Sequence, residues 1–145
     1  MALVLLLHRV ANSLVYDLES AVHRPAGWSW SAFRLLFTLW VAGAQDPSRA
    51  AELTGMSRAA VSALAKTLGV AGLLVRTPDP NDRRSVTLSL SDAGVRRLEE
   101  TFAIHNRREA EWAGLLTADE LTVLIGLLGK LADAAQGQTW VNRRF

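Results

Sequence analysis

The sequence predicts a mainly helical protein with one small β-hairpin placed after its middle. Over most of the 145 residues, apolar side chains recur at spacings of three and four, which is the period of amphipathic helices. Residues 85–90 instead alternate strictly, with Val86, Leu88 and Leu90 on one face of the expected strand. Half of the residues are apolar, which is enough for one globular domain (residues 1–145) with a substantial core.

The first two helices are expected at residues 3–22 and 30–42. Pro25 and Gly27 end the first helix, and Ser29 is the expected N-cap of the second. The first turns of the first helix are apolar on all sides, so another surface must cover them. Its continuous apolar stripe consists of Leu3, Leu7, Val10, Leu14, Leu18 and Ala21.

Short elements follow in the order helix, turn, helix, strand, strand. Gly55 supplies the backbone freedom that a tight turn requires, and Ser57 is the expected N-cap of the second short helix. Pro78 begins a polar turn that cannot continue a strand ladder. The expected ranges are 47–54 and 58–71 for the helices, and 73–77 and 85–90 for the strands.

Two longer helices complete the chain. Ser91 caps a helix expected over residues 92–113, in which His105 lies on the apolar stripe and is expected to be half-buried. Thr117 and Glu120 have the spacing of a capping box, which opens a last helix that ends near Ala135.

This order of elements is that of a winged helix-turn-helix, with the hairpin as the wing. We expect residues 29–91 to form that lobe, and residues 1–24 and 92–145 to form a helical dimerisation lobe. The terminal helices carry more apolar surface than one small winged helix can cover. A second copy of the chain would bury it, so a homodimer is predicted; the alternative is a monomer whose terminal helices pack on their own core.

The outer side of the second short helix is typical of a helix that enters the major groove of DNA. Its inner side is apolar, whereas its outer side carries small and polar residues that permit close approach. Ser57 and the free backbone N–H groups at the helix start could bind a phosphate. Residues 48–84 have a net charge of +3, and the rest of the chain has −1. Double-stranded DNA is therefore the predicted partner, and the predicted contacts are Ser57, Arg58, Ala59, Ser62, Ala63 and Lys66.

Residues 57–68 (SRAAVSALAKTL) resemble the recognition helix of the MarR-type (multiple antibiotic resistance) regulators. Residues 72–76 resemble the exit of that family into its wing. The following segment is similar to the family's wing signature, matched here at Asp82, Arg84, Leu88, Leu90 and Ser91. The resemblance spans nearly the whole chain, but Gly69, Val70 and Ala71 stand where family members usually carry charged residues.

The resemblance and elementary electrostatics agree on the tip of the wing. An arginine can enter the narrow, electronegative minor groove, and Arg84 is the expected reader. Asp82 would hold its guanidinium as a brace, while Arg83 would contact phosphate. The alternative is that Asp82 and Arg84 form an ion pair that only stabilises the turn.

The resemblance implies a cytoplasmic repressor that binds a pseudo-palindromic operator as a homodimer and responds to a small-molecule effector. The expected effector pocket lies near the junction of the first two helices, and its candidate residues are His8, Trp28, Trp30 and Arg34. For the two tryptophans, a place in the core is the equal alternative.

Other classes of function have little support in the sequence. There is no cysteine, and the three histidines lack metal-ligand spacing, so neither a metal nor another cofactor is expected. No nucleophile-and-base pair or glycine-rich phosphate loop suggests an enzyme. No stretch approaches the roughly 18 apolar residues of a membrane span, so no membrane partner is expected. The remaining alternative is a winged helix that binds another protein without specific DNA binding.

Overall fold

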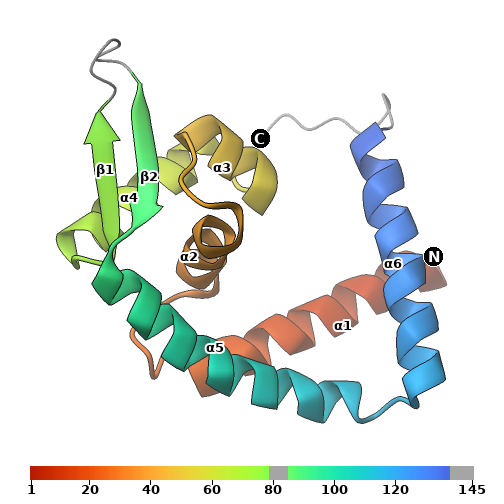
Figure 1. The fold of residues 1–145 in the computed structure, drawn as a ribbon. Coiled ribbons are helices and arrows are strands. Elements are labelled where there is room, and N and C mark those ends of the chain that lie inside the picture. The colour runs from red at the N-terminus through yellow and green to blue at the C-terminus, as the bar shows by residue number, and fades with distance from the viewer. Residues whose placement is uncertain (79–84, 138–145) are drawn as a thin grey trace. The chain divides into compact units, whose positions relative to one another are not determined.

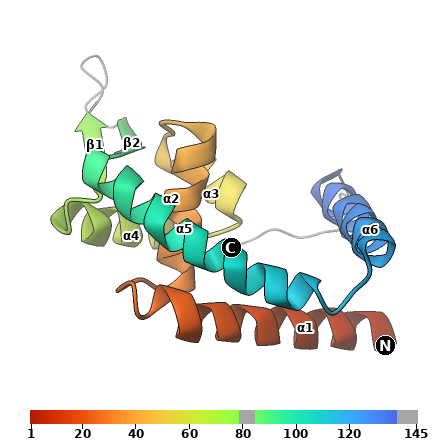
Figure 2. The same ribbon diagram turned by 60° about the horizontal axis from the view of Figure 1, so that its bottom comes forward.

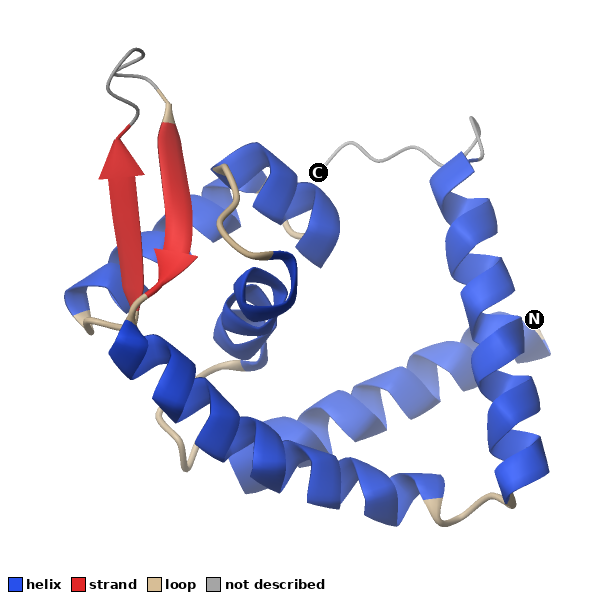
Figure 3. Ribbon diagram, viewed as in Figure 1, coloured by secondary structure: helices blue, strands red, loops and turns tan. Residues whose placement is uncertain are grey.

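The computed structural model describes residues 1–78 and 85–137. Contacts divide the chain into two compact units, Met1–His105 and Asn106–Phe145. The described residues form helices and one two-stranded antiparallel sheet, which confirms the predicted fold class (Figure 1, Figure 3).

The first unit begins with α1 (Ala2–Leu18), which continues directly into a single π-helical turn, η1 (Glu19–His23). The backbone N–H of Arg24 bonds to the carbonyl of Glu19, five residues earlier, at 2.9 Å. The apolar period predicted one helix over this stretch but not the change of helical type. A π-turn rotates the residues after it relative to those before it. Val22 and His23 are therefore buried, whereas the start of α1 is exposed.

Helix α2 (Trp30–Ala42) has the predicted bounds. It occupies the centre of the winged helix. The Ser29 hydroxyl accepts a bond from the N–H of Ala32 at 3.1 Å, so the predicted N-cap is present. Leu35 and Leu36 are completely buried, and they pack in one apolar cluster with residues from α3, α4, α5 and both strands. This shared core fixes the positions of the shorter elements around α2.

Helices α3 (Pro47–Thr54) and α4 (Arg58–Val70) lead into the hairpin of β1 (Leu74–Pro78) and β2 (Val86–Leu90). The strands are antiparallel, with Leu74 opposite Leu90 and Pro78 opposite Val86. Our placement of Pro78 in the turn was wrong, because this residue is the last of β1. Proline is tolerated at the end of an edge strand, where its missing N–H breaks no internal ladder.

Helix α5 (Asp92–Ala113) leaves the hairpin at a close contact. The Ser91 hydroxyl donates to the carbonyl of Gly72 at 2.6 Å and accepts from the N–H of Gly94 at 3.0 Å. Gly94 lies against the backbone of Leu73, where a Cβ atom would come within 2.0 Å of the carbonyl oxygen. Only glycine fits at this position.

The second unit contains the last part of α5 and helix α6 (Ala118–Gly137). The predicted capping box is present: the Glu120 carboxylate accepts from the N–H of Thr117 at 2.9 Å. This backbone bond is the main cause that lowers the pKa of Glu120 below its usual value, and a bond from the Thr117 hydroxyl acts in the same direction. No helix among the described residues is long and apolar enough to cross a membrane.

Candidate nucleic-acid interface

The helix-turn-helix is formed by α3, α4 and the three residues between them. Asp46 caps α3 by accepting bonds from the N–H groups of Ser48 and Arg49 at 2.8 and 3.0 Å. Gly55 has φ +67°, the left-handed conformation that the turn requires and that glycine adopts without strain. Ser57 then caps α4 by accepting from the N–H of Ala60 at 3.1 Å. The turn at Gly55 and the cap at Ser57 are as predicted, whereas the sequence analysis did not identify Asp46 as the cap of α3.

Helix α4 has a buried side and an exposed side. Val61, Ala65 and Leu68 are buried in the core cluster, and Leu64 packs against that cluster. The DNA contacts predicted for this helix and its cap lie on the other side or at the N-terminal end: Arg58, Ala59, Ser62, Ala63 and Lys66 are exposed, and Ser57 is half-buried at the cap. The structure therefore brings these residues to one exposed helix face next to the hairpin (Figure 1 and Figure 2).

The charges at this surface are mostly solvated. Arg49 pairs with Glu52 at 2.9 Å in an exposed pair, while Arg76 is exposed on β1. The pKa of Asp46 is lowered mainly by the bond from the Arg49 backbone N–H, and the nearby positive charge of Arg58 acts in the same direction. Asp46 thus stays ionised and holds the start of α3 at neutral pH. An exposed arginine or lysine keeps its charge available for phosphate.

Asp82, Arg83 and Arg84, the predicted residues of the wing tip, lie outside the described residues. The strands on either side are described. Their inward residue Leu88 is almost completely buried, and its backbone forms a further bridge with Gln45. Strand β2 is therefore hydrogen-bonded to the loop before α3.

The four predicted pocket residues occupy different surroundings. His8 is exposed on α1 and bonds to Asn12 at 2.9 Å. Trp28 is buried in the core, and Trp30 is half-buried with its ring 6.0 Å from that of Phe33. Arg34 donates a hydrogen bond to the backbone carbonyl of Thr54, in the helix-turn-helix. The structure brings the two tryptophans to one aromatic cluster, and the effector pocket stays a prediction.

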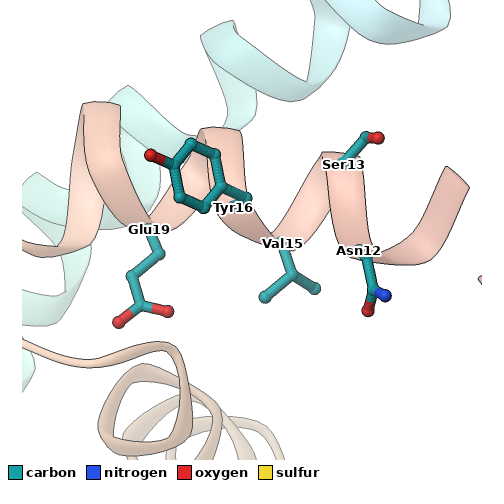
Figure 4. A pocket seen from close by; sticks show the side chains of 5 residues that line it. All are labelled: Asn12, Ser13, Val15, Tyr16 and Glu19. Atoms are coloured by element: carbon teal, nitrogen blue, oxygen red, sulfur yellow. The ribbon is translucent and has the colours of Figure 1, made fainter. Parts of the chain in front are cut away.

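A hollow on α1 is lined by residues that the sequence analysis did not predict as a site. Its lining consists of Asn12, Ser13, Val15, Tyr16 and Glu19, and Figure 4 shows Asn12, Val15 and Glu19 on one side of the helix. Asn12, Tyr16 and Glu19 recur at spacings of four and three, so the helical period puts them on neighbouring positions of one face. That spacing of polar groups is the sequence signal that could have identified them.

His23 is a second feature that the sequence did not reveal. Its side chain is completely buried, and both ring nitrogens lack a hydrogen-bond partner among residues 1–78 and 85–137. The ring packs 4.3 Å from that of Phe33 and 5.4 Å from that of His105, which is 7% exposed and thus deeper than the half-buried position we expected. Burial, and secondarily the charge of His105, lowers the pKa of His23 to about 4.

A helix-turn-helix followed by a β-hairpin, with an exposed small and basic helix face, defines the class of winged helix-turn-helix proteins. The model of the MarR family matches residues 28–86. The HTH-type transcriptional regulator YwaE of Bacillus subtilis (strain 168) is 38% identical over 127 residues, which cover 88% of this chain and 74% of that protein.

Solved structures of MarR and PcaV are similar to this chain over most of its length. A mutant MarR from E. coli complexed with operator DNA has a TM-score of 0.82 and 25% identity, over 90% of this chain and 94% of that one. PcaV of Streptomyces coelicolor in complex with its natural ligand has a TM-score of 0.75 and 26% identity, over 90% of this chain and 91% of that one. The chain belongs to the MarR family of transcriptional regulators.

Proposed function

We propose that this protein is an effector-responsive repressor that binds a pseudo-palindromic operator as a homodimer. The observation that carries the proposal is the exposed face of α4, where small residues and Lys66 surround a capped helix start. In this arrangement α4 enters the major groove, because Ala59, Ser62 and Ala63 offer little steric hindrance. Arg58 and Lys66 bind the phosphates beside it.

The wing supplies the second contact of each half-site. Arg84 enters the minor groove, Asp82 holds its guanidinium, and Arg83 binds phosphate. This part of the proposal is supported by the position of β1, which follows α4 in the chain and packs on it. Residues 29–91 act as the DNA-binding lobe in this scheme.

Dimerisation is supported by the exposed apolar residues of both terminal helices. Leu3, Leu5 and Leu6 of α1 are each about 60% exposed, and α6 exposes a stripe of its own. A second copy would cover these surfaces, and it would set two α4 helices about one turn of DNA apart. Residues 1–24 and 92–145 form the dimerisation lobe in this proposal. In this proposal the operator overlaps a promoter, so that the bound dimer excludes RNA polymerase and represses transcription in the cytoplasm.

An effector would act by changing the spacing of the two recognition helices. The hollow on α1 and the aromatic cluster of Trp28 and Trp30 are the two candidate places for it. The ligand complex of PcaV, which has the same fold, supports this part of the proposal. No catalytic step is required.

The test is a salt titration of binding to a labelled duplex from the gene's own upstream region, beside a scrambled duplex. Tight, salt-sensitive binding to the native duplex alone would support the proposal. Lys66→Ala should weaken binding to both duplexes and lower the salt slope by about one, as expected for one lost phosphate contact. Lys130→Ala removes the same charge from an exposed position of α6. This variant should leave the affinities and the salt slope unchanged.

Arg84→Ala should reduce binding to the native duplex while the dimer and the fold stay intact. Full retained affinity would remove the wing from the mechanism. Equal, weak binding of the wild-type protein to both duplexes, and to a set of duplexes tiled across the neighbouring genes, would contradict specific DNA binding. A winged helix that serves a protein partner would then replace it.

A further inference from the structure

Arg34 makes a contact that the DNA-binding scheme does not use. It lies on α2, is half-buried, and donates a hydrogen bond from its guanidinium to the carbonyl oxygen of Thr54. Thr54 is the last residue of α3, and the turn to the recognition helix begins immediately after it. The same guanidinium nitrogen lies 3.8 Å from where a Cβ atom of Gly55 would be. Arg34 thus bonds to the last residue of α3, and its guanidinium lies beside Gly55, the first residue of the turn.

The chemistry of this contact suits a cation. The last carbonyl groups of a helix lack partners within the helix and carry the negative end of its dipole. A guanidinium there makes a charge-assisted bond, which is stronger than a bond between neutral groups. Because Arg34 extends from the central helix of the core, the bond ties the turn to the most deeply buried part of the winged helix.

The turn has its own internal bonds, but they do not join it to α2. The Thr54 hydroxyl donates to the carbonyl of Ala50 at 2.7 Å, and the N–H of Met56 approaches that hydroxyl at 3.4 Å. These bonds stabilise the end of α3 and the turn itself. The angle at which α4 leaves the turn depends on contacts to the rest of the core, and Arg34 supplies a polar one at the pivot.

We propose that Arg34 is a positioning residue of the DNA interface, which sets the placement of α4 by holding the α3–α4 turn against α2. This inference rests on the proposed function, because it gives the placement of α4 a role in reading base sequence. Base readout requires side chains to be held to within a fraction of an ångström, whereas phosphate attraction tolerates displacement. Arg34 therefore affects discrimination between duplexes more than it affects non-specific binding.

The experiment compares Arg34→Met, which keeps an unbranched apolar stem but removes the donors, with Arg34→Lys, which keeps the charge. Arg24→Met is the matched control, since Arg24 is exposed and pairs with Glu19 at 3.7 Å, away from the turn. Affinities for the native and the scrambled duplex are measured on protein titrated for its active fraction. A loss of stability alone therefore does not change the result.

Arg34→Met should bind the native duplex about tenfold more weakly, equivalent to one misplaced base contact, with unchanged affinity for the scrambled duplex. Arg34→Lys should recover part of the loss, and Arg24→Met should match the wild type. A salt slope lowered by about one would instead mean that Arg34 touches phosphate. An unchanged ratio of the two affinities would mean a purely structural role. Either result overturns the proposal.

Amide hydrogen exchange of the free protein provides a readout that does not depend on DNA. Arg34→Met should raise exchange over residues 54–60 and leave that of β1 and β2 unchanged. Unchanged exchange over residues 54–60 would also overturn the inference. If the wild-type protein fails to discriminate the duplexes, the proposed function fails, and this exchange measurement still decides whether Arg34 holds the turn.

Discussion

The winged helix and the terminal helices carry the same kind of apolar stripe, but the stripe is buried in the first and exposed in the second. In the winged helix, apolar residues of α2, α4 and β2 meet in one cluster, and Leu35, Leu36 and Leu88 are at most 1% exposed. In α1 and α6, comparable stripes are exposed: Leu3 by 60% and Ile125 by 61%. A stripe thus predicts a helix and an apolar partner surface. Whether that partner lies in the same chain depends on the tertiary structure.

This difference has a consequence for stability. The winged helix has its own core, so substitutions inside it should change folding of the single chain. The apolar surfaces of α1 and α6 are expected to be buried between chains, so substitutions there should change association. The following predictions test this division, beginning with the largest effect.

Gly94→Ala should destabilise the winged helix most. The new Cβ atom would come within 2.0 Å of the Leu73 carbonyl oxygen, a backbone atom that cannot rotate away. We expect the free energy of unfolding to fall by about 3 kcal/mol, because α5 must move away from the hairpin. Urea denaturation followed by tryptophan fluorescence measures this. A wild-type midpoint would show that the contact is looser than the structure indicates.

Leu124→Glu should act on association instead of folding. Leu124 is 41% exposed on α6, so its replacement leaves the core of the single chain intact. At a two-fold interface each substitution acts twice, and the buried carboxylates should weaken dimerisation by about a hundredfold. Analytical ultracentrifugation over a range of concentrations measures the effect. Lys130→Glu, at an exposed polar position of the same helix, is the control.

An unchanged dimer in Leu124→Glu, with the wild-type dissociation constant, would contradict the assignment of α6 to an interface between chains. The apolar stripe of α6 would then need a partner within the chain. A dimer lost in both variants would point to a general effect of negative charge on this helix.

His23 should make the stability of the first unit depend on pH. Its pKa is about 4 in the folded protein and about 6.5 in an unfolded chain, so the unfolded state binds more protons between these values. Its contribution is complete above pH 6.5 and is lost as the pH falls toward 4. At pH 5 the loss is about 2 kcal/mol relative to pH 7.5.

The measurement is the free energy of unfolding between pH 7.5 and 5 for the wild type, His23→Phe and His8→Phe. The His23 variant should lose most of this pH dependence. His8 is exposed on α1, so its variant should keep the dependence. Parallel curves for all three proteins would show that His23 does not titrate in this range.

Gly69→Ala should have the smallest effect, and in the opposite direction to Gly94→Ala. Gly69 lies inside α4, and an added Cβ atom would meet the Leu74 carbonyl oxygen at an ordinary 3.6 Å. Alanine is favoured over glycine in a helix, so unfolding should cost up to about 1 kcal/mol more. The same urea denaturation measures this. A destabilised variant would mean that the end of α4 is packed more tightly than the structure indicates.

The amino-acid pattern was sufficient to predict the order of the helices and strands, apart from the π-helical turn η1. Ser29, Gly55 and Ser57 act locally, through caps and backbone conformation, so their roles follow from residue type and spacing. The same holds for the outer face of α4, because helical period alone separates it from the buried side. The bounds of α2 and α3 were therefore correct as predicted.

Contacts between residues far apart in the chain became visible only in the folded protein. The contact of Arg34 with Thr54 joins residues 20 positions apart, and no local pattern distinguishes it from the pocket in which we had placed Arg34. The burial of His23 follows from the π-turn and from its packing on α2 and α5. Caps and periodicities are local properties of the chain. Contacts between helices depend on how the whole core packs, and the physical reason is that many arrangements share the same local pattern.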